Sequence, residues 1–216
     1  MKRLATLLIA VLTAGLLAAC GTSFDASGYI QALLDNSYKN DSTGFVEMKI
    51  GTAEEAAKLY EEGLDSEVKA LLATADISEE QIEDYRQVFA DILASAKYTV
   101  GEAKKQDDGS YVVTITYEQM KIFEPAVEEY YTVIGEILDE WTAAALAGEE
   151  VASEEEMMEM IMLELKTCLD NALAGVTYGE PETTTITIEL VDGVYTPKEE
   201  DIYSLELKLF DTEAMQ

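Results

Sequence analysis

Carboxylates are the most abundant residues in this chain that could do chemistry, because its 216 residues include 44 aspartates and glutamates and no histidine. Without histidine, the Ser-His-Asp and Cys-His arrangements that activate a nucleophile are excluded, as are zinc sites with histidine ligands. Two carboxylates can still hydrolyse a glycosidic bond without histidine. No local motif selects such a pair here, so we keep a carboxylate-based, glycosidase-like hydrolase as an alternative function and assign no catalytic residue.

Other residues that could bind a metal have simpler structural interpretations. Oxygen ligands for calcium occur at Asp35, Asn36, Asn40 and Asp41. Their spacing differs from that of an EF-hand loop, which favours an ordinary polar loop. Cys168 lies in an apolar helical stretch and is expected in the core. The methionines at 157, 158, 160 and 162 spread around a helix, so they cannot form one copper(I) site. We expect no metal and no cofactor.

Aromatic residues provide the candidate ligand surface. The chain has twelve tyrosines and one tryptophan, and several of them fall in or after the first predicted hairpin. Aromatic rings that carry a polar tip are common at binding surfaces and equally common in the cores of small sheets. The candidate ligand-contacting residues are Tyr98, Tyr117, Tyr131 and Trp141.

Several helices can be placed from their first turns. Four segments fit the capping box, in which a Ser or Thr and a Glu or Gln three residues later exchange side-chain-to-backbone hydrogen bonds. The pairs are Thr52 with Glu55, Ser78 with Gln81, Ser153 with Glu156, and Thr196 with Glu199. The first three predict helices over 53–73, 79–96 and 154–174, and two more are predicted over 25–39 and 125–147. The fourth capping box, at Thr196, favours a C-terminal helix over a strand. Segment 45–50 fits either a strand or a helix extension.

Two hairpins separate these helices. Alternating apolar and polar residues predict strands over 98–105, 111–118 and 183–191, with a short return at 194–195, and the turns are Asp107-Asp108-Gly109 and Asp192-Gly193. We therefore expect an α+β fold, in which an antiparallel sheet of about four strands from two hairpins packs with five to six helices on one face. Residues 25–216 are expected to form one domain.

The first twenty residues have the layout of an export signal. A basic pair, Lys2 and Arg3, precedes an apolar run that is shorter than the roughly 20 residues of a membrane-spanning helix. The run ends in Leu17-Ala18-Ala19-Cys20, which resembles the lipobox of bacterial lipoproteins. The resemblance implies that residues 1–19 are a signal peptide, that Ala18, Ala19 and Gly21 belong to the processing site, and that the lipid on Cys20 anchors the protein. Residues 20–24 would be the lipidated terminus and tether. An ordinary signal peptide or a membrane anchor with an incidental cysteine is the alternative.

Composition limits the partners. The formal net charge of −30 repels phosphate backbones and anionic headgroups, which argues against nucleic-acid binding. With Cys20 lipidated, Cys168 would have no partner for an intrachain disulfide. Apolar residues make up 48% of the chain, enough for a packed core.

Four further stretches resemble uncharacterised lipoproteins of Gram-positive bacteria that carry one extracytoplasmic domain of unknown function. They are Phe24 to Ser27, Lys97 to Lys105, Tyr178 to Pro181 and Asp192 to Pro197. The resemblance implies surface anchoring and an α+β fold, and it supplies no catalytic residues. The order of elements is also loosely similar to cystatin-like and nuclear-transport-factor-like folds.

These patterns favour a lipid-anchored protein on the extracytoplasmic face of the cell membrane that binds a small ligand or a surface protein without catalysing a reaction. The carboxylate-based hydrolase is the main alternative. A substrate-binding component of a transporter is a third, although such proteins usually have two larger lobes.

Overall fold

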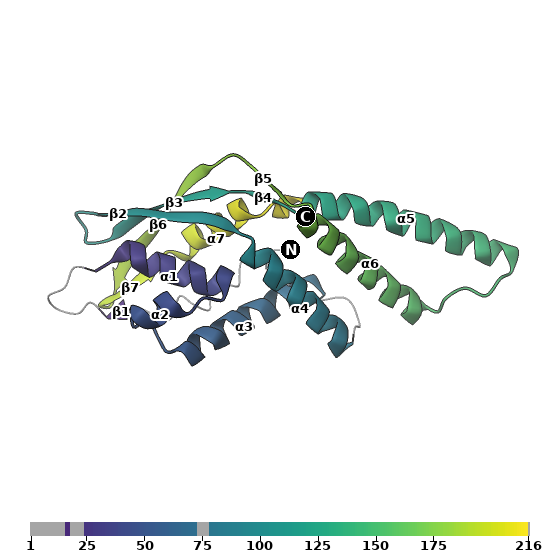
Figure 1. Cartoon of the computed structure of the whole chain (residues 1–216), viewed down its shortest axis with the longest axis horizontal. Coiled ribbons are helices and arrows are strands. Elements are labelled where there is room, and N and C mark those ends of the chain that lie inside the picture. The colour runs from purple at the N-terminus through teal and green to yellow at the C-terminus, as the bar shows by residue number, and fades with distance from the viewer. Residues whose placement is uncertain (1–15, 18–23, 73–77, 216) are drawn as a thin grey trace.

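Two hairpins meet at the centre of an antiparallel sheet, in which the strand order is β1-β7-β6-β3-β2 (Figure 1). The structure, a computed structural model, describes residues 16–17, 24–72 and 78–215. The strands of this sheet are β1 (Leu16–Leu17), β2 (Lys97–Lys105), β3 (Tyr111–Glu118), β6 (Glu182–Val191) and β7 (Val194–Pro197). The hairpins β2–β3 and β6–β7 join through β3 and β6, where Val113 lies opposite Ile186. The predicted α+β class and antiparallel sheet are confirmed.

The short strand β1 lies within the segment that we predict to be a signal peptide. Its two residues pair with Val194 and Tyr195 of β7 at one edge of the sheet. Cleavage before Cys20 would remove β1 and leave the four strands expected from the two hairpins.

Alternation along β3 determines which face of the sheet is buried. Tyr111, Val113, Ile115 and Tyr117 are buried, and the residues between them are half-buried. The helices around this sheet are α1 (Ala26–Lys39), α2 (Thr43–Glu47), α3 (Ala53–Leu71), α4 (Glu79–Ala94) and α7 (Glu199–Leu209). Helices α1 and α7 make the main contacts with the strands, and α2, α3 and α4 pack on α1. In Figure 1, α1 to α4 lie on one side of the sheet. One hydrophobic cluster includes residues from α1, the sheet and α7.

Helix starts follow the predicted caps at three of the four capping boxes. The boxes of Thr52, Ser78 and Ser153 form as expected, each with both reciprocal hydrogen bonds. Asp25 caps α1 by accepting a hydrogen bond from the Gly28 backbone N–H at 2.9 Å. Segment 45–50, which the sequence left undecided, begins inside the short helix α2.

The fourth predicted capping box, at Thr196, is wrong. Thr196 belongs to β7 and lies opposite Glu189, and the N-cap of α7 is Lys198, which makes no side-chain cap. The backbone of this segment is already engaged with β6, since the Lys198 N–H donates to the Thr187 carbonyl at 2.8 Å. Pairing with the sheet therefore delays the helix, although the prediction of a helix here is correct.

A helical arm extends away from the sheet and the other helices (Figure 1). We use "the arm" for residues 123–174, which comprise α5 (Phe123–Ala147), the connecting loop and α6 (Glu154–Ala174). Its base rests near a small second sheet of β4 (Met120–Lys121) and β5 (Thr177–Tyr178), and near the 3-10 helix η3 (Thr212–Met215). Between residues 127 and 161 no side chain of the arm is buried.

The base of the arm is held in the core. Cys168 is 1% exposed there, which confirms its predicted place, and burial raises the pKa of its thiol. The hydroxyl of Tyr85 on α4 donates to the Met162 carbonyl at 2.6 Å. Among the described residues, no helix is both long and apolar enough to cross a membrane.

Candidate functional site

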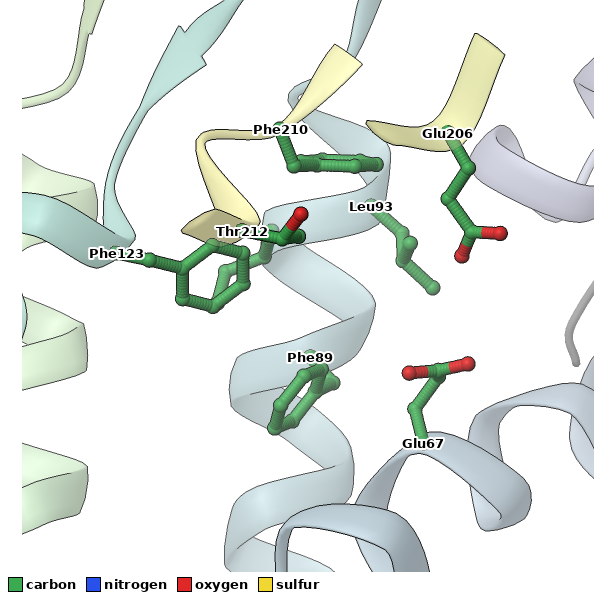
Figure 2. A pocket seen from close by; sticks show the side chains of 8 residues that line it. Glu67, Phe89, Leu93, Phe123, Glu206, Phe210 and Thr212 are labelled. Carbon is green, nitrogen blue, oxygen red and sulfur yellow. The ribbon is translucent and has the colours of Figure 1, made fainter. Parts of the chain in front are cut away.

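Two buried glutamates face each other across a small pocket between α3 and α7 (Figure 2). Glu67 of α3 is 3% exposed and Glu206 of α7 is 6% exposed. The other lining residues are Phe89, Ile92, Leu93, Phe123, Phe210 and Thr212. The cavity has a volume of about 20 Å³, which is room for one water molecule.

The surroundings of these glutamates favour their neutral form. Burial, and then the charge of Glu206, raise the pKa of Glu67 to about 9. Burial raises the pKa of Glu206 to about 8. Glu67 Oε1, Glu206 Oε2 and Thr212 Oγ1 have no hydrogen-bond partner in the structure. We therefore expect both carboxyl groups to hold protons at neutral pH, because an apolar lining disfavours charge.

This pair bears on the hydrolase alternative. A buried acid pair is what a glycosidase-like mechanism needs, but the two carboxyls must also admit a sugar and an attacking water. A space for one water cannot hold a sugar ring. The geometry of this pocket therefore gives the hydrolase no support.

Sequence reasoning missed this pair, although a signal was present. Glu67 stands between Leu64 and Leu71 on the apolar face of its helix. Glu206 stands next to Leu205 in a stretch where apolar residues recur at helical spacing. An acid at a core position of an amphipathic helix is the pattern that would have identified each residue.

A second, more open pocket lies against α3. Its volume is about 330 Å³, and it is lined by Phe45, Ile50, Gly51, Glu55, Lys58, Leu59 and Glu62. The charged groups around it already have partners. Glu55 completes the capping box with Thr52, and Lys58 pairs with Glu62 at 3.5 Å. This hollow presents no free polar group of the kind that would orient a ligand.

The four candidate aromatic residues divide into two separate places. Tyr98 and Tyr117 lie directly opposite each other on β2 and β3. The Tyr98 hydroxyl donates to Asp35 at 2.7 Å, and the Tyr117 hydroxyl donates to Glu182 at 3.1 Å. Tyr131, which is 71% exposed, and Trp141, which is half-buried, lie on the arm instead. None of the four lines either pocket, and their role in ligand binding stays a prediction.

The remaining candidate residues are in the acidic loop and at the N-terminus. Asp35 accepts hydrogen bonds from Gln31 and Tyr98, and the Asn36 amide donates to the Ala56 carbonyl. Within the described ranges, no three carboxylates or thiols gather as a metal site. The predicted lipidation and processing residues, Ala18, Ala19, Cys20 and Gly21, lie outside the described residues.

Exposed apolar side chains concentrate on the arm. Of the eleven large hydrophobic residues exposed in the described part of the chain, seven fall between residues 131 and 163. They are Tyr131, Leu138, Leu146, Val151, Met158, Met160 and Leu163. Three of them follow one another along α5, where Tyr131 is 71%, Leu138 48% and Leu146 85% exposed. A concentration of exposed apolar side chains on one part of a protein is typical of interaction sites.

The arm is tied to the body at the start of α5. Asp211, which precedes η3 and is 7% exposed, accepts three backbone hydrogen bonds there. Its Oδ1 accepts from Ile122 N at 3.0 Å and from Phe123 N at 2.9 Å, and its Oδ2 accepts from Glu124 N at 3.0 Å. A carboxylate at a helix N-terminus satisfies otherwise unpaired N–H groups and complements the helix dipole. Asp211 therefore serves as a cap supplied from the far end of the chain.

Fold and surface together define an α+β protein with a protruding helical arm. No protein family model and no curated protein matches the sequence. The fold is similar to the crystal structure of a candidate lipoprotein, YcdA, from Bacillus subtilis subsp. subtilis str. 168, with a TM-score of 0.51 and 12% sequence identity. The match covers 86% of this chain and 56% of that chain, so this chain spans little more than half of its neighbour's length. At this identity the likeness establishes the fold alone.

Proposed function

We propose that this protein is a lipid-anchored, extracytoplasmic binding protein whose arm contacts another protein. The observation that carries the proposal is the arm itself, which has no buried side chain between residues 127 and 161 yet holds most of the exposed large hydrophobic residues described. Helices in water normally bury their apolar face against another element. A partner that covers the arm would complete that burial.

Membrane anchoring is supported by the first twenty residues. Leu17-Ala18-Ala19-Cys20 resembles a lipobox, and the structural neighbour is itself described as a candidate lipoprotein. On this proposal the lipid holds the protein at the outer face of the cell membrane. The negative net charge would keep the folded domain away from anionic headgroups.

A binding role is also favoured over catalysis by the two pockets. The acid pair encloses room for a single water, and the charged groups around the larger hollow are already paired with each other or with a helix cap. The unpaired oxygens of Glu67 and Glu206 face a space too small for a substrate, and the larger hollow offers no charged group without a partner.

We expect Cys20→Ala to abolish lipidation and signal cleavage. In cells, wild-type protein should take up radiolabelled palmitate and partition into the detergent phase of a phase-separation extract. The variant should take up no label and should migrate as the larger, unprocessed form. Cys168→Ala is the matched control and should label like wild type. A Cys20→Ala protein that is still cleaved and labelled would contradict the anchor.

Contact through the arm can be tested by site-specific photocrosslinking in whole cells. A photoreactive residue at Leu138 should yield a discrete higher-mass product, since this side chain is 48% exposed on α5. The same residue at Leu190, which is 47% exposed on β6, is the matched control and should yield none. Equal products at both positions, or none at Leu138, would contradict the arm as the contact site.

A further inference from the structure

We infer that the partner surface for the arm is a basic amphipathic helix. This inference rests on the proposed function and names the chemistry of the partner. It follows from three features of α5, namely the spacing of its exposed apolar residues, an unsupported glycine within them, and the charge around them.

The exposed residues of α5 form a stripe with helical spacing. Tyr131, Leu138 and Leu146 follow at intervals of seven and eight residues, and the exposed Gly135 and Thr142 lie between them on the same side of the helix. We call these five residues the α5 stripe. Residues that recur every seven or eight positions stay on one side of a helix, and such a side packs along a second helix. The stripe spans 16 residues, or about 24 Å, so a helix of roughly 18 residues would cover it.

Gly135 gives an independent indication that a backbone approaches closely here. It lies inside α5, where glycine costs stability relative to alanine. Its φ angle is not in the left-handed region, and a Cβ at this position would have nothing within 4 Å. No feature of the described chain therefore calls for a glycine. A docked helix would, since a missing side chain lets a partner's backbone come close.

The negative charge of the arm indicates that its partner is positively charged. Residues 123–174 contain fourteen acids and a single basic residue, Lys166. Glu128 and Asp139 are exposed and border the stripe, being three residues before Tyr131 and four residues after Gly135. Acids also surround the tip of the arm, at 149, 150 and 154–156. A partner must therefore bring positive charge beside its apolar face.

The same charge disfavours the other occupants of the stripe. A second copy of this chain would place two strongly acidic arms side by side, and an anionic membrane surface would repel the arm. A basic helix gains both apolar contact and charge complementarity, so it fits better than either.

The test uses the full chain in nanodiscs of phosphatidylcholine and a fluorescent 18-residue peptide of leucine and lysine, with leucine at heptad positions a and d. A scrambled peptide of identical composition has the same charge without the apolar stripe. We expect the patterned peptide to bind at least tenfold more tightly than the scrambled one, measured by fluorescence anisotropy against empty nanodiscs. Binding should weaken as salt rises, because exposed charges are screened.

Variants then locate the binding site. Leu138→Ser should weaken binding of the patterned peptide about tenfold, since a leucine contact is lost. Leu190→Ser removes a leucine of similar exposure from β6 and should change binding less than twofold. Gly135→Leu should weaken binding about tenfold by filling the stripe, whereas the open space around Gly135 means that the fold should tolerate it.

A different substitution of the same glycine separates stability from binding. Gly135→Ala should raise the melting temperature by about 2–4 °C, because alanine is the better helix former in an open site. If the melting temperature falls instead, Gly135 has a structural role in the isolated chain, and the argument for close approach is wrong.

Three outcomes would overturn the inference. One is equal binding of the patterned and scrambled peptides, which would mean that charge alone acts. Another is that Leu138→Ser and Gly135→Leu bind the patterned peptide as tightly as wild type does. The third is concentration-dependent dimerisation of wild type, seen in sedimentation and lost in Leu138→Ser, which would make a second copy the occupant. If the patterned peptide does not bind but the photoreactive residue at Leu138 still crosslinks to a partner in cells, only the chemistry inferred for the partner is wrong and the proposed function stands.

Discussion

Replacing Asp211 with alanine is expected to lower the free energy of unfolding by about 3 kcal/mol. The carboxylate is buried and accepts the backbone N–H groups of Ile122, Phe123 and Glu124 at 2.9–3.0 Å. The residue at the N-cap position of α5, Ile122, has no side chain that could cap the helix. A lost N-cap costs about 0.5–2 kcal/mol, and a buried N–H left unpaired adds about 1–3 kcal/mol.

The arm offers its own probe for this prediction, because Trp141 on α5 is the chain's single tryptophan. Urea unfolding followed by tryptophan fluorescence should show a larger loss of stability for Asp211→Ala than for Asp25→Ala. The fluorescence transition, which reports on the arm, should precede the part of the circular-dichroism change that comes from the helices outside the arm. Asp25→Ala removes an exposed cap that accepts one bond, from Gly28 at 2.9 Å, and should cost only about 1 kcal/mol. If Asp211→Ala and Asp25→Ala unfold at the same urea concentration, Asp211 is not what secures the arm.

Glu67→Gln should make the protein more stable at pH 8 by about 2–4 kcal/mol and leave it nearly unchanged at pH 4. The folded-state pKa of Glu67 is raised to about 9 and that of Glu206 to about 8, from an ordinary value of 4.5. Below pH 4.5 both the folded and the unfolded chain hold these protons. As pH rises from about 4.5 to about 9, the unfolded chain ionises first, so the wild type loses stability across this window.

The expected magnitude follows from the size of the raised pKa. One pKa unit corresponds to about 1.4 kcal/mol, and a shift of several units therefore gives several kcal/mol as an upper limit. Glutamine has the shape of a protonated glutamic acid and does not ionise. Glu206→Gln should act in the same direction. Because the two groups share one cavity, the double variant should gain less than the sum of the single variants.

The measurement is the difference between variant and wild type in urea unfolding at pH 4, 6 and 8. This difference removes the effect of the large overall negative charge, which also changes with pH. Glu47→Gln, at an exposed residue of α2, is the control for loss of one negative charge. If Glu67→Gln and Glu47→Gln change stability equally at every pH, the buried pair does not hold its protons in the way inferred.

Local features of this protein follow from its sequence alone. The capping boxes of Thr52, Ser78 and Ser153 place three helix starts, because each rests on hydrogen bonds between residues three apart. The two hairpins follow from alternating residues and from turns that contain glycine at positive φ, Gly109 and Gly193. The α+β class and the antiparallel sheet depend on these local patterns.

The first failure of the sequence interpretation lies where two local preferences compete. Thr196 satisfies the pattern of a capping box, but pairing of its backbone with β6 prevails and the helix starts later. A cap contributes about 1 kcal/mol, whereas the strand satisfies several backbone groups together. The outcome depends on the position of β6, which no window around Thr196 contains.

The candidate site shows the same division. Composition and the absence of histidine restricted the chemistry, and the first twenty residues predicted where the protein is held, because both depend on residue types and their order. Only the tertiary structure brings Glu67 and Glu206 to one cavity, places Asp211 at the start of α5 and leaves the arm without a covering element (Figures 1 and 2). These features depend on contacts between distant segments. Packing of the whole chain buries the two glutamates, which raises their pKa, and leaves the α5 stripe exposed, and no single segment determines either result.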